Sequence, residues 1–498
     1  MKKISSNLIM VLFLWLTFSY TNEKKASGSS DYMTIDESIT AIKVPCTAAL
    51  SATNHGINIP EKGIIVDTIK CKKNQKFSYA LYLPDHYNPI IKWPVIYIFD
   101  PAARGSLAVK NFKQAAEQYG YIVACSNNSR NGSLNNSIES AKYMFDDVEN
   151  RFSPDFKRIY TAGFSGGSRV AALVALTTKN IAGVIGCGAG FPNGKELRPG
   201  ESDSFVYIGI VGEKDMNYLE MFDLEQELNS HKIVARVITT DADHSWPDPK
   251  IINDAVAWLE LKEMVKGTRP GEQVFIDKQF KNQTEQAVKM GMNGKWFEAA
   301  KQYRYLLRDF PNQPDIALYQ KRLDSIEKSI AYRKDVRSWN SIRKKELSMY
   351  ETLMTSLNEA YMAKAFTDSI QGYWKREIGF LKKTERSQNK DEQCMAARLS
   401  GWLGIICWEE GKNYLNSNNY RNAVVAYKIL TLLQPDNANS FYNLSRAYAF
   451  QKHNNESLAS LERAIKLGIK NRSVIENDSA FLMLKNDKHY KMLLNTIQ

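Results

Sequence analysis

Ser165 lies in Gly163-Phe164-Ser165-Gly166-Gly167, a G-x-S-x-G pattern of the kind that presents a serine nucleophile to acyl carbonyls. A short β-rich run, 158–162, precedes the pattern, and an apolar run, 170–176, follows it. A strand, a sharp turn and a buried helix are therefore predicted around the serine. The turn strains the backbone, and the flanking glycines let neighbouring chain approach closely. The alternative is a glycine-rich turn that contains a serine by coincidence.

A serine nucleophile needs a base that takes its proton and an acid that orients the base. Of the six histidines, only His231 and His244 follow Ser165 within the same apparent domain. His231 opens a strand-like run, 232–238, and is interpreted as a surface residue at the start of a strand. His244 lies in the polar loop after that run, where a catalytic base is expected; the alternative is a solvated loop histidine.

The acid is expected between the serine and the base. The near-continuous apolar run 205–211 is typical of a buried parallel strand. Asp215 lies just past its end and is the candidate acid. Glu213, Asp241 and Asp243 are the rivals, and the last two are too close in sequence to the base to reach its far nitrogen.

The chain order Ser165, Asp215, His244 is that of the α/β hydrolases. Residues 60–265 resemble a compact α/β hydrolase of the secreted esterase and dienelactone-hydrolase-like type. The resemblance implies a mostly parallel sheet with flanking helices, followed here by an all-α helical domain. It also implies ester hydrolysis through an acyl-enzyme, with no cofactor. No metal is expected either, because the histidines are scattered and no His/Cys cluster has ligand spacing.

The loop after the predicted strand 94–99 differs from the family. Asp100-Pro101-Ala102-Ala103-Arg104-Gly105 stands where the family often has His-Gly-Gly-like letters. Pro101 has no N–H and cannot donate to an oxyanion. Ala102 or Ala103 is therefore the candidate loop donor, with Gly166 as the second donor. Arg104 either meets an anionic substrate or is a solvated surface charge.

The beginning of the chain predicts export. A charged start and a short apolar run, 8–16, indicate a signal peptide over 1–21, because the run is short for a membrane span. Residues 22–59 read as a flexible lead-in, and the mature chain is expected to be periplasmic or extracellular. Export permits a Cys46–Cys71 disulfide, whereas Cys125 and Cys187 end apolar runs and are expected to be buried thiols.

The 498 residues are too many for one typical core, and the pattern changes after a linker at 266–271. Residues 272–498 are predicted to be helical. In 296–311 and 420–435, a small residue is followed by an aromatic residue four positions on and a proline eight beyond that. This spacing resembles the tetratricopeptide repeat, most clearly over 404–471 and more weakly over 280–313. A terminal cap is expected over 477–494; the alternative is an ordinary helical bundle.

Charge separates the two halves. Residues 1–265 hold 28 Lys and Arg against 29 Asp and Glu, whereas residues 266–498 hold 38 against 25. The basic surplus could favour an acidic partner, an anionic polymer or a membrane surface, although solvated helix faces explain it most simply. Export argues against nucleic acid as a partner, and no membrane span is expected after signal removal.

Three functions follow from these patterns. The first is an exported serine hydrolase acting on carboxylic esters, with helical repeats that bind a protein partner or position substrate. The second is a non-catalytic interaction protein with a hydrolase-like scaffold. The third is a serine peptidase related to prolyl oligopeptidases, which is disfavoured because no β-propeller-like segment precedes the hydrolase region.

Overall fold

The computed structural model describes residues 60–178, 180–194, 197–200 and 202–497. The chain divides into two compact units. One unit ends at Ser325 and leaves out Lys214–Met216, which group with Ile326–Gln498 in the other. The predicted signal peptide (1–21), the lead-in (22–59) and Cys46 lie outside the described residues.

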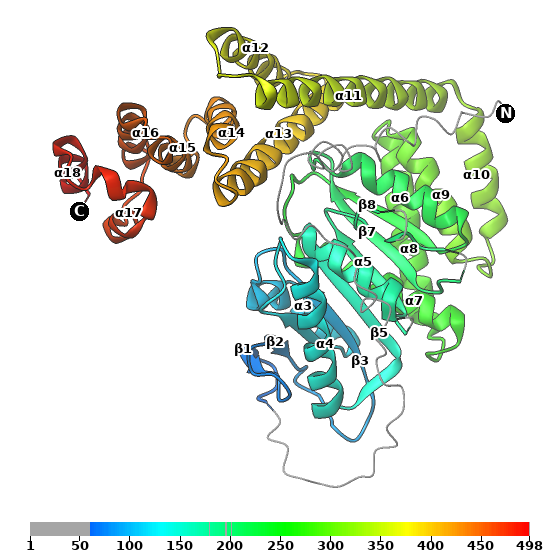
Figure 1. Ribbon diagram of the computed structural model, residues 1–498. Coiled ribbons are helices and arrows are strands. Elements are labelled where there is room, and N and C mark those ends of the chain that lie inside the picture. The colour runs from blue at the N-terminus through cyan, green and yellow to red at the C-terminus, as the bar shows by residue number, and fades with distance from the viewer. Residues whose placement is uncertain (1–59, 179, 195–196, 201, 498) are drawn as a thin grey trace. The chain divides into compact units, whose positions relative to one another are not determined.

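The first unit is built on one sheet of eight strands in the order β1-β2-β4-β3-β5-β6-β7-β8 (Figure 1). β2 pairs antiparallel with both β1 and β4, and every other pair is parallel. This mostly parallel sheet confirms the predicted α/β-hydrolase fold class. The strands are β1 (Ile65–Lys70), β2 (Ser78–Tyr82), β3 (Trp93–Phe99), β4 (Ile122–Ser126), β5 (Pro154–Phe164), β6 (Gly183–Cys187), β7 (Val206–Gly212) and β8 (Ala235–Thr240).

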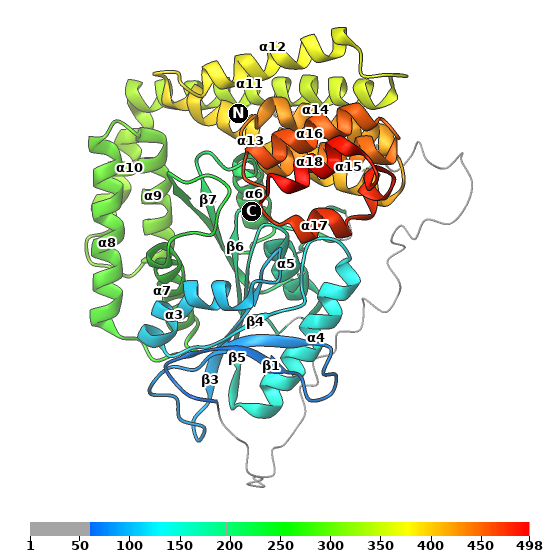
Figure 2. The same ribbon diagram turned by 90° about the vertical axis from the view of Figure 1, so that its left-hand side faces the viewer.

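Helices cover both faces of this sheet (Figure 2). α3 and α7 pack together on one face, and α5 packs beside α4 on the other. Two glycines of β6 show which helix covers which face of the sheet. An added Cβ at Gly183 would meet Leu259 of α7 on one face, and one at Gly186 would meet Ser168 of α5 on the other. The helices are α3 (Gly105–Tyr119), α4 (Leu134–Arg151), α5 (Gly166–Thr178), α6 (Tyr218–Ser230) and α7 (Pro249–Lys266).

The central strands have the burial that their sequence predicts. Every residue of β3 and of β7 is buried, as expected for parallel strands covered on both faces. α7 has a local capping signal at each end. It begins after the side-chain cap of Asp248 and ends at Gly267, whose φ of 74° is the left-handed C-cap conformation. Cys125 and Cys187 are confirmed as buried thiols.

The first unit continues past residue 265, where the sequence places the end of the hydrolase region. α8 (Gln273–Met292) and α9 (Trp296–Asp309) pack on each other, and α10 (Ile316–Lys328) follows them. α9 is tied to the sheet edge because the Tyr305 hydroxyl accepts a hydrogen bond from the backbone N–H of Val237 in β8 at 3.0 Å. Asp309 at its end accepts one from Trp258 of α7 at 2.7 Å. Buried polar contacts therefore hold this helical hairpin to β8 and α7 of the first unit.

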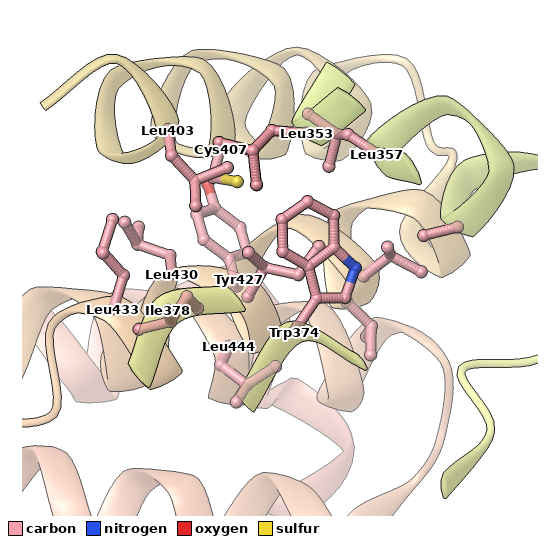
Figure 3. Packing of buried hydrophobic residues seen from close by; sticks show 14 of the residues in the cluster. Leu353, Leu357, Trp374, Ile378, Leu403, Cys407, Tyr427, Leu430, Leu433 and Leu444 are labelled. Carbon is pink, nitrogen blue, oxygen red and sulfur yellow. The ribbon is translucent and has the colours of Figure 1, made fainter. Parts of the chain in front are cut away.

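The second unit is helical. Its elements are α11 (Ile330–Met362), α12 (Asp368–Thr384), α13 (Lys390–Asn416), α14 (Tyr420–Leu433), α15 (Ala438–Phe450), α16 (Asn454–Lys466), α17 (Arg472–Asn477), the 3-10 helix η3 (Ser479–Leu484) and α18 (Lys488–Asn495). Figure 3 shows its main core, in which Trp374 and Tyr427 lie among leucines of several helices. Segments η3 and α18 contact α15 and α16. Among the described residues, the helices are all too short or too polar to span a membrane.

Candidate active site

Ser165 occupies the turn between β5 and α5, as the motif predicts. Its φ is +53°, a left-handed conformation that is costly for a residue with a Cβ. The backbone N–H of Ser165 donates to the Cys187 carbonyl of the neighbouring strand at 2.8 Å. The side chain is partly exposed. The strained turn therefore holds the hydroxyl at the carboxyl edge of the sheet, where parallel α/β proteins bind their ligands.

The glycines of the motif are required by close backbone approach. A Cβ at Gly163 would lie 2.2 Å from the Gly167 carbonyl oxygen, and one at Gly167 would lie 2.1 Å from the Phe99 carbonyl oxygen. Phe99 ends β3, so the second approach sets the serine turn directly against the start of the loop 100–104. We call this loop the oxyanion loop, after its predicted role.

His244 is brought to the serine by the loop that follows β8. Its Nε2 lies 2.9 Å from the Ser165 Oγ, within hydrogen-bonding distance for proton transfer. Its ring stacks at a tilt on Phe164, with centroids 4.8 Å apart. His231, the other histidine that the sequence considers, ends α6 instead of opening a strand, because β8 begins at Ala235. The structure therefore pairs Ser165 with His244.

Asp215 follows β7 in the turn predicted for the acid. Its side chain is 1% exposed. The turn starts beside the histidine loop, because a Cβ at Gly212 would lie 2.1 Å from the Ala242 carbonyl oxygen. Among its rivals, Glu213 forms an ion pair with Lys295 at 3.1 Å, and Asp241 and Asp243 are exposed. Asp215 remains the predicted acid on these observations.

The predicted oxyanion donors differ in their surroundings. Gly166 is the first residue of α5, where backbone N–H groups have no intrahelical partner. Ala102 N–H donates to Asp100 Oδ1 at 2.8 Å, and Ala103 N–H donates to the Asp100 carbonyl at 3.1 Å. An oxyanion would therefore share the proton of either loop amide with Asp100, whereas the Gly166 N–H lies in the first turn of a helix, where it has no intrahelical acceptor.

Arg104, the predicted substrate contact, is paired within its own loop. Its Nε donates to Asp100 Oδ1 and one terminal nitrogen donates to Asp100 Oδ2, each at 2.9 Å. The arginine side chain is 46% exposed, whereas Asp100 is fully buried. Contact with an anionic substrate stays a prediction. Asp100 uses two of the five guanidinium N–H donors, and the other three, on the two terminal nitrogens, could serve such a contact.

A second ion pair fixes the loop after β6. Arg169 of α5 binds Glu220 of α6 at 2.8 Å, and Glu220 Oε1 accepts the Gly190 N–H at 2.9 Å. Burial by itself would raise the pKa of Glu220, but the Arg169 charge and these hydrogen bonds outweigh it and hold the pKa below its usual value. The loop beside the serine turn is thus anchored by an ionised carboxylate.

Sequence reasoning missed two residues near the site. The side chain of Asn131 reaches Gly166, since a Cβ there would lie 1.9 Å from the Asn131 Oδ1. The Asn131 N–H also donates to the Pro101 carbonyl at 2.8 Å. Trp246 lies two residues after the base and contacts Phe164, with ring centroids 5.5 Å apart. Both contacts depend on tertiary structure, and only the nearness of Trp246 to His244 was visible in the sequence.

An open pocket of about 410 Å³ adjoins the oxyanion loop. Its lining is mostly polar and comprises Asp67, Thr68, Ser78, Ala103, Arg104, Gly105, Ser106, Leu107 and Asn127. Within the part of the chain that the structure describes, no three His, Cys, Asp or Glu side chains converge as metal ligands would.

No protein-family model matches the chain, and no curated protein matches it. Similar solved structures include S-formylglutathione hydrolase from Staphylococcus aureus, at 14% identity and a TM-score of 0.34 over 40% of this chain and 98% of that chain. An esterase from Pyrobaculum calidifontis is 12% identical, with a TM-score of 0.34 over 40% and 86%. Esterase B from Lactobacillus rhamnosis is 13% identical, with a TM-score of 0.34 over 43% and 93%.

Proposed function

We propose that the chain is a serine hydrolase whose substrates are carboxylic esters and whose nucleophile is Ser165. The observation that carries the proposal is the 2.9 Å separation of Ser165 Oγ and His244 Nε2. The positive φ of Ser165 supports it, because backbone strain of this kind persists where the surrounding structure requires it, typically at active sites.

In the proposed acylation step, Ser165 Oγ attacks the ester carbonyl while His244 Nε2 takes the hydroxyl proton. The carbonyl oxygen becomes an oxyanion, which the Gly166 N–H and a loop amide stabilise. The ester C–O bond then breaks, and His244 returns the proton to the departing alcohol. Ser165 is left as an acyl ester and His244 as a neutral imidazole.

In the proposed deacylation step, water replaces the alcohol. His244 takes a proton from the water as its oxygen attacks the acyl carbonyl, and gives that proton to Ser165 Oγ as the acid leaves. Asp215 is proposed to hold the imidazole and to stabilise its protonated form. Its burial and its place in the turn after β7 support this role.

The test is labelling with a fluorophosphonate, read by intact mass, on the wild type and on Ser165→Ala. We expect one adduct per wild-type chain and none on the variant, because the reagent phosphonylates only an activated serine. Folded wild-type protein that takes up no label would overturn the proposal and favour the scaffold function. An adduct that survives in Ser165→Ala would place the nucleophile elsewhere.

The substrate class is tested on the same protein. Little chain lies between the end of β6 at Cys187 and the start of β7 at Val206, so we propose that no large lid formed by this segment covers Ser165. Bulky esters, including acyl groups on carbohydrates, are therefore proposed to fit. Rates on short-chain, long-chain, aromatic-acid and peptide substrates separate the alternatives. A strict preference for long-chain esters would contradict the open site, and a preference for peptides would favour the peptidase.

We also propose that 404–471 are tetratricopeptide-like repeats. Such repeats place a small residue of one helix against an aromatic residue of the next. One contact and one burial support the proposal: a Cβ at Gly411 of α13 would lie 2.7 Å from the Tyr427 ring of α14, and Ala423 of α14 is fully buried. Consecutive helices α13 to α16 also pack on one another.

Two glycines of α13 allow a paired test of this packing. Gly411→Ala is expected to lower the free energy of unfolding of the second unit by about 1–3 kcal/mol, because the added methyl overlaps a rigid ring. Gly401→Ala in the same helix has nothing within 4 Å. It is expected to raise that free energy by about 0.5–1 kcal/mol, because alanine favours helix. Equal effects of the two substitutions in urea denaturation would argue against the repeat packing.

A further inference from the structure

Asp100 is a fully buried carboxylate with five donors. Its Oδ1 accepts the backbone N–H groups of Ala102 at 2.8 Å and Arg104 at 3.2 Å, together with the Arg104 Nε at 2.9 Å. Its Oδ2 accepts the terminal nitrogen of Arg104 at 2.9 Å and the indole N–H of Trp246 at 2.8 Å. A carboxylate has about four lone-pair positions, so its hydrogen-bonding capacity is fully used.

The charge of Asp100 is retained in this environment. Burial by itself would raise its pKa, but hydrogen bonds from Arg104, from Trp246 and from backbone N–H groups outweigh burial and hold the pKa below its usual value. Arg104 neutralises the carboxylate at close range. The pair therefore presents little net charge to an oxyanion formed nearby.

These bonds join two segments that are far apart in sequence. Ala102 and Arg104 belong to the oxyanion loop, whereas Trp246 belongs to the histidine loop, residues 241–248. The Trp246 ring also packs on Phe164, whose ring contacts His244. Through Trp246, the carboxylate therefore fixes the loop that carries the proposed base.

The oxyanion loop needs such a constraint. Ala103 has a φ of +58°, which costs roughly 1–2 kcal/mol for a residue with a Cβ. The strained turn closes on Asp100, whose carbonyl accepts the Ala103 N–H. The backbone of Asp100 is in turn packed on the serine turn, because a Cβ at Gly167 would lie 3.0 Å from the Asp100 nitrogen.

We propose that Asp100 is a positioning residue: its buried carboxylate holds the oxyanion loop and the histidine loop in one arrangement around Ser165. The inference rests on the proposed function. Stability alone gives little reason for such a group, since a buried ion pair is often no more stabilising than well-packed apolar residues. The carboxylate instead links the oxyanion loop to the histidine loop through hydrogen bonds to both. The relative position of these two loops determines where the oxyanion and the base lie.

Asp147 provides a matched control in the same unit. It is also buried, and it also pairs with an arginine four residues later, Arg151. It accepts the Lys72 backbone N–H and the Tyr79 hydroxyl, each at 2.8 Å. None of these three partners belongs to the oxyanion loop or the histidine loop. Asp147→Asn therefore removes a similar buried charge without altering the hydrogen bonds between the oxyanion loop and the histidine loop.

The experiment compares Asp100→Asn and Asp147→Asn by kcat and KM on a chromogenic short-chain ester and by the rate of fluorophosphonate labelling. In either orientation, the NH2 group of the asparagine faces N–H donors of Arg104 or Trp246 that the aspartate oxygens accepted. Two donors cannot bond to each other, so we expect the two loops to move apart. We expect kcat and labelling rate to fall about 10²-fold in Asp100→Asn, with KM changed less than about 3-fold. Asp147→Asn is expected to keep all three within about 3-fold while losing comparable thermal stability.

Trp246→Phe keeps the proposal testable if Asp100→Asn does not fold. It removes one donor and keeps an aromatic ring, so a roughly 10-fold fall in kcat is expected, and the double variant should be no slower than Asp100→Asn. Equal losses in Asp100→Asn and Asp147→Asn, or a wild-type rate in Trp246→Phe, would overturn the inference alone, because the wild type still labels. A wild type that neither labels nor hydrolyses esters would overturn the proposed function and this inference with it.

Discussion

Ser165→Ala and His244→Ala are each expected to hydrolyse a chromogenic short-chain ester at least about 10⁴-fold more slowly than the wild type, as a drop in kcat. The hydroxyl and the imidazole that face each other at 2.9 Å are proposed to act as one unit. Without the base, the serine proton has no acceptor; without the serine, the base has nothing to activate. Initial rates at saturating ester measure the effect.

The same reasoning predicts the rates of the double variant and of a control variant. Ser165→Ala/His244→Ala should be about as slow as either single variant, because residues that act as a unit are not additive. His231→Ala, at the end of α6 in the same unit, should keep the wild-type rate. Additive losses, or a similar loss in His231→Ala, would show that the two side chains do not cooperate in catalysis.

Asp309→Asn is expected to lower the free energy of unfolding of the first unit by about 3–5 kcal/mol, the usual effect of removing one partner of a buried ion pair. The Asp309 carboxylate is buried and binds Lys262 Nζ at 2.5 Å, with Arg236 at 3.6 Å. The substitution leaves both cations buried without their counter-charge. Denaturation in urea measures the loss, and the exposed Asp277→Asn serves as a control expected to stay within about 0.5 kcal/mol.

The effect of Asp309 should depend on pH. Burial by itself would raise its pKa, but Arg308, Lys262 and Arg236 outweigh burial and lower the pKa to about 2. An aspartate in the unfolded chain titrates near pH ~3.9. The stabilisation is therefore complete above about pH 4 and is lost as the pH falls toward 2. The difference between wild type and Asp309→Asn should shrink over that window; a constant difference would contradict the prediction.

The local elements of the fold were predictable because their signals are short-range. The strands at β3 and β7 are nearly continuous apolar runs, and α7 has its own N-terminal and C-terminal caps. The serine turn needs glycines within two residues of Ser165. Each of these patterns indicates a backbone conformation that depends mainly on residues close in sequence. A single sequence is therefore enough to locate these elements.

The position of His231 shows where local signals fail. The apolar run after it predicts a strand starting at 232, yet α6 continues to Ser230 and β8 starts at Ala235. Pairing decides the boundary, because β8 is defined by its register with β7 from Tyr207 onward. The propensity of a segment carries no information about the strand with which it pairs. The boundaries of helices and strands are therefore the least predictable part of a secondary-structure prediction.

By itself, the sequence determined the fold class and named the candidate nucleophile, base and acid, because the strand and turn signals lie in short segments and the order of the candidates can be read along the chain. Only the tertiary structure decided that α8 and α9 belong to the first unit, since buried charges of α9 meet partners on β8 and α7. It alone also showed which groups the Asp100 carboxylate contacts. The Asp100 carboxylate accepts a hydrogen bond from Trp246, which lies 146 residues later in the chain. No local sequence pattern predicts a contact between two loops that are so far apart in sequence.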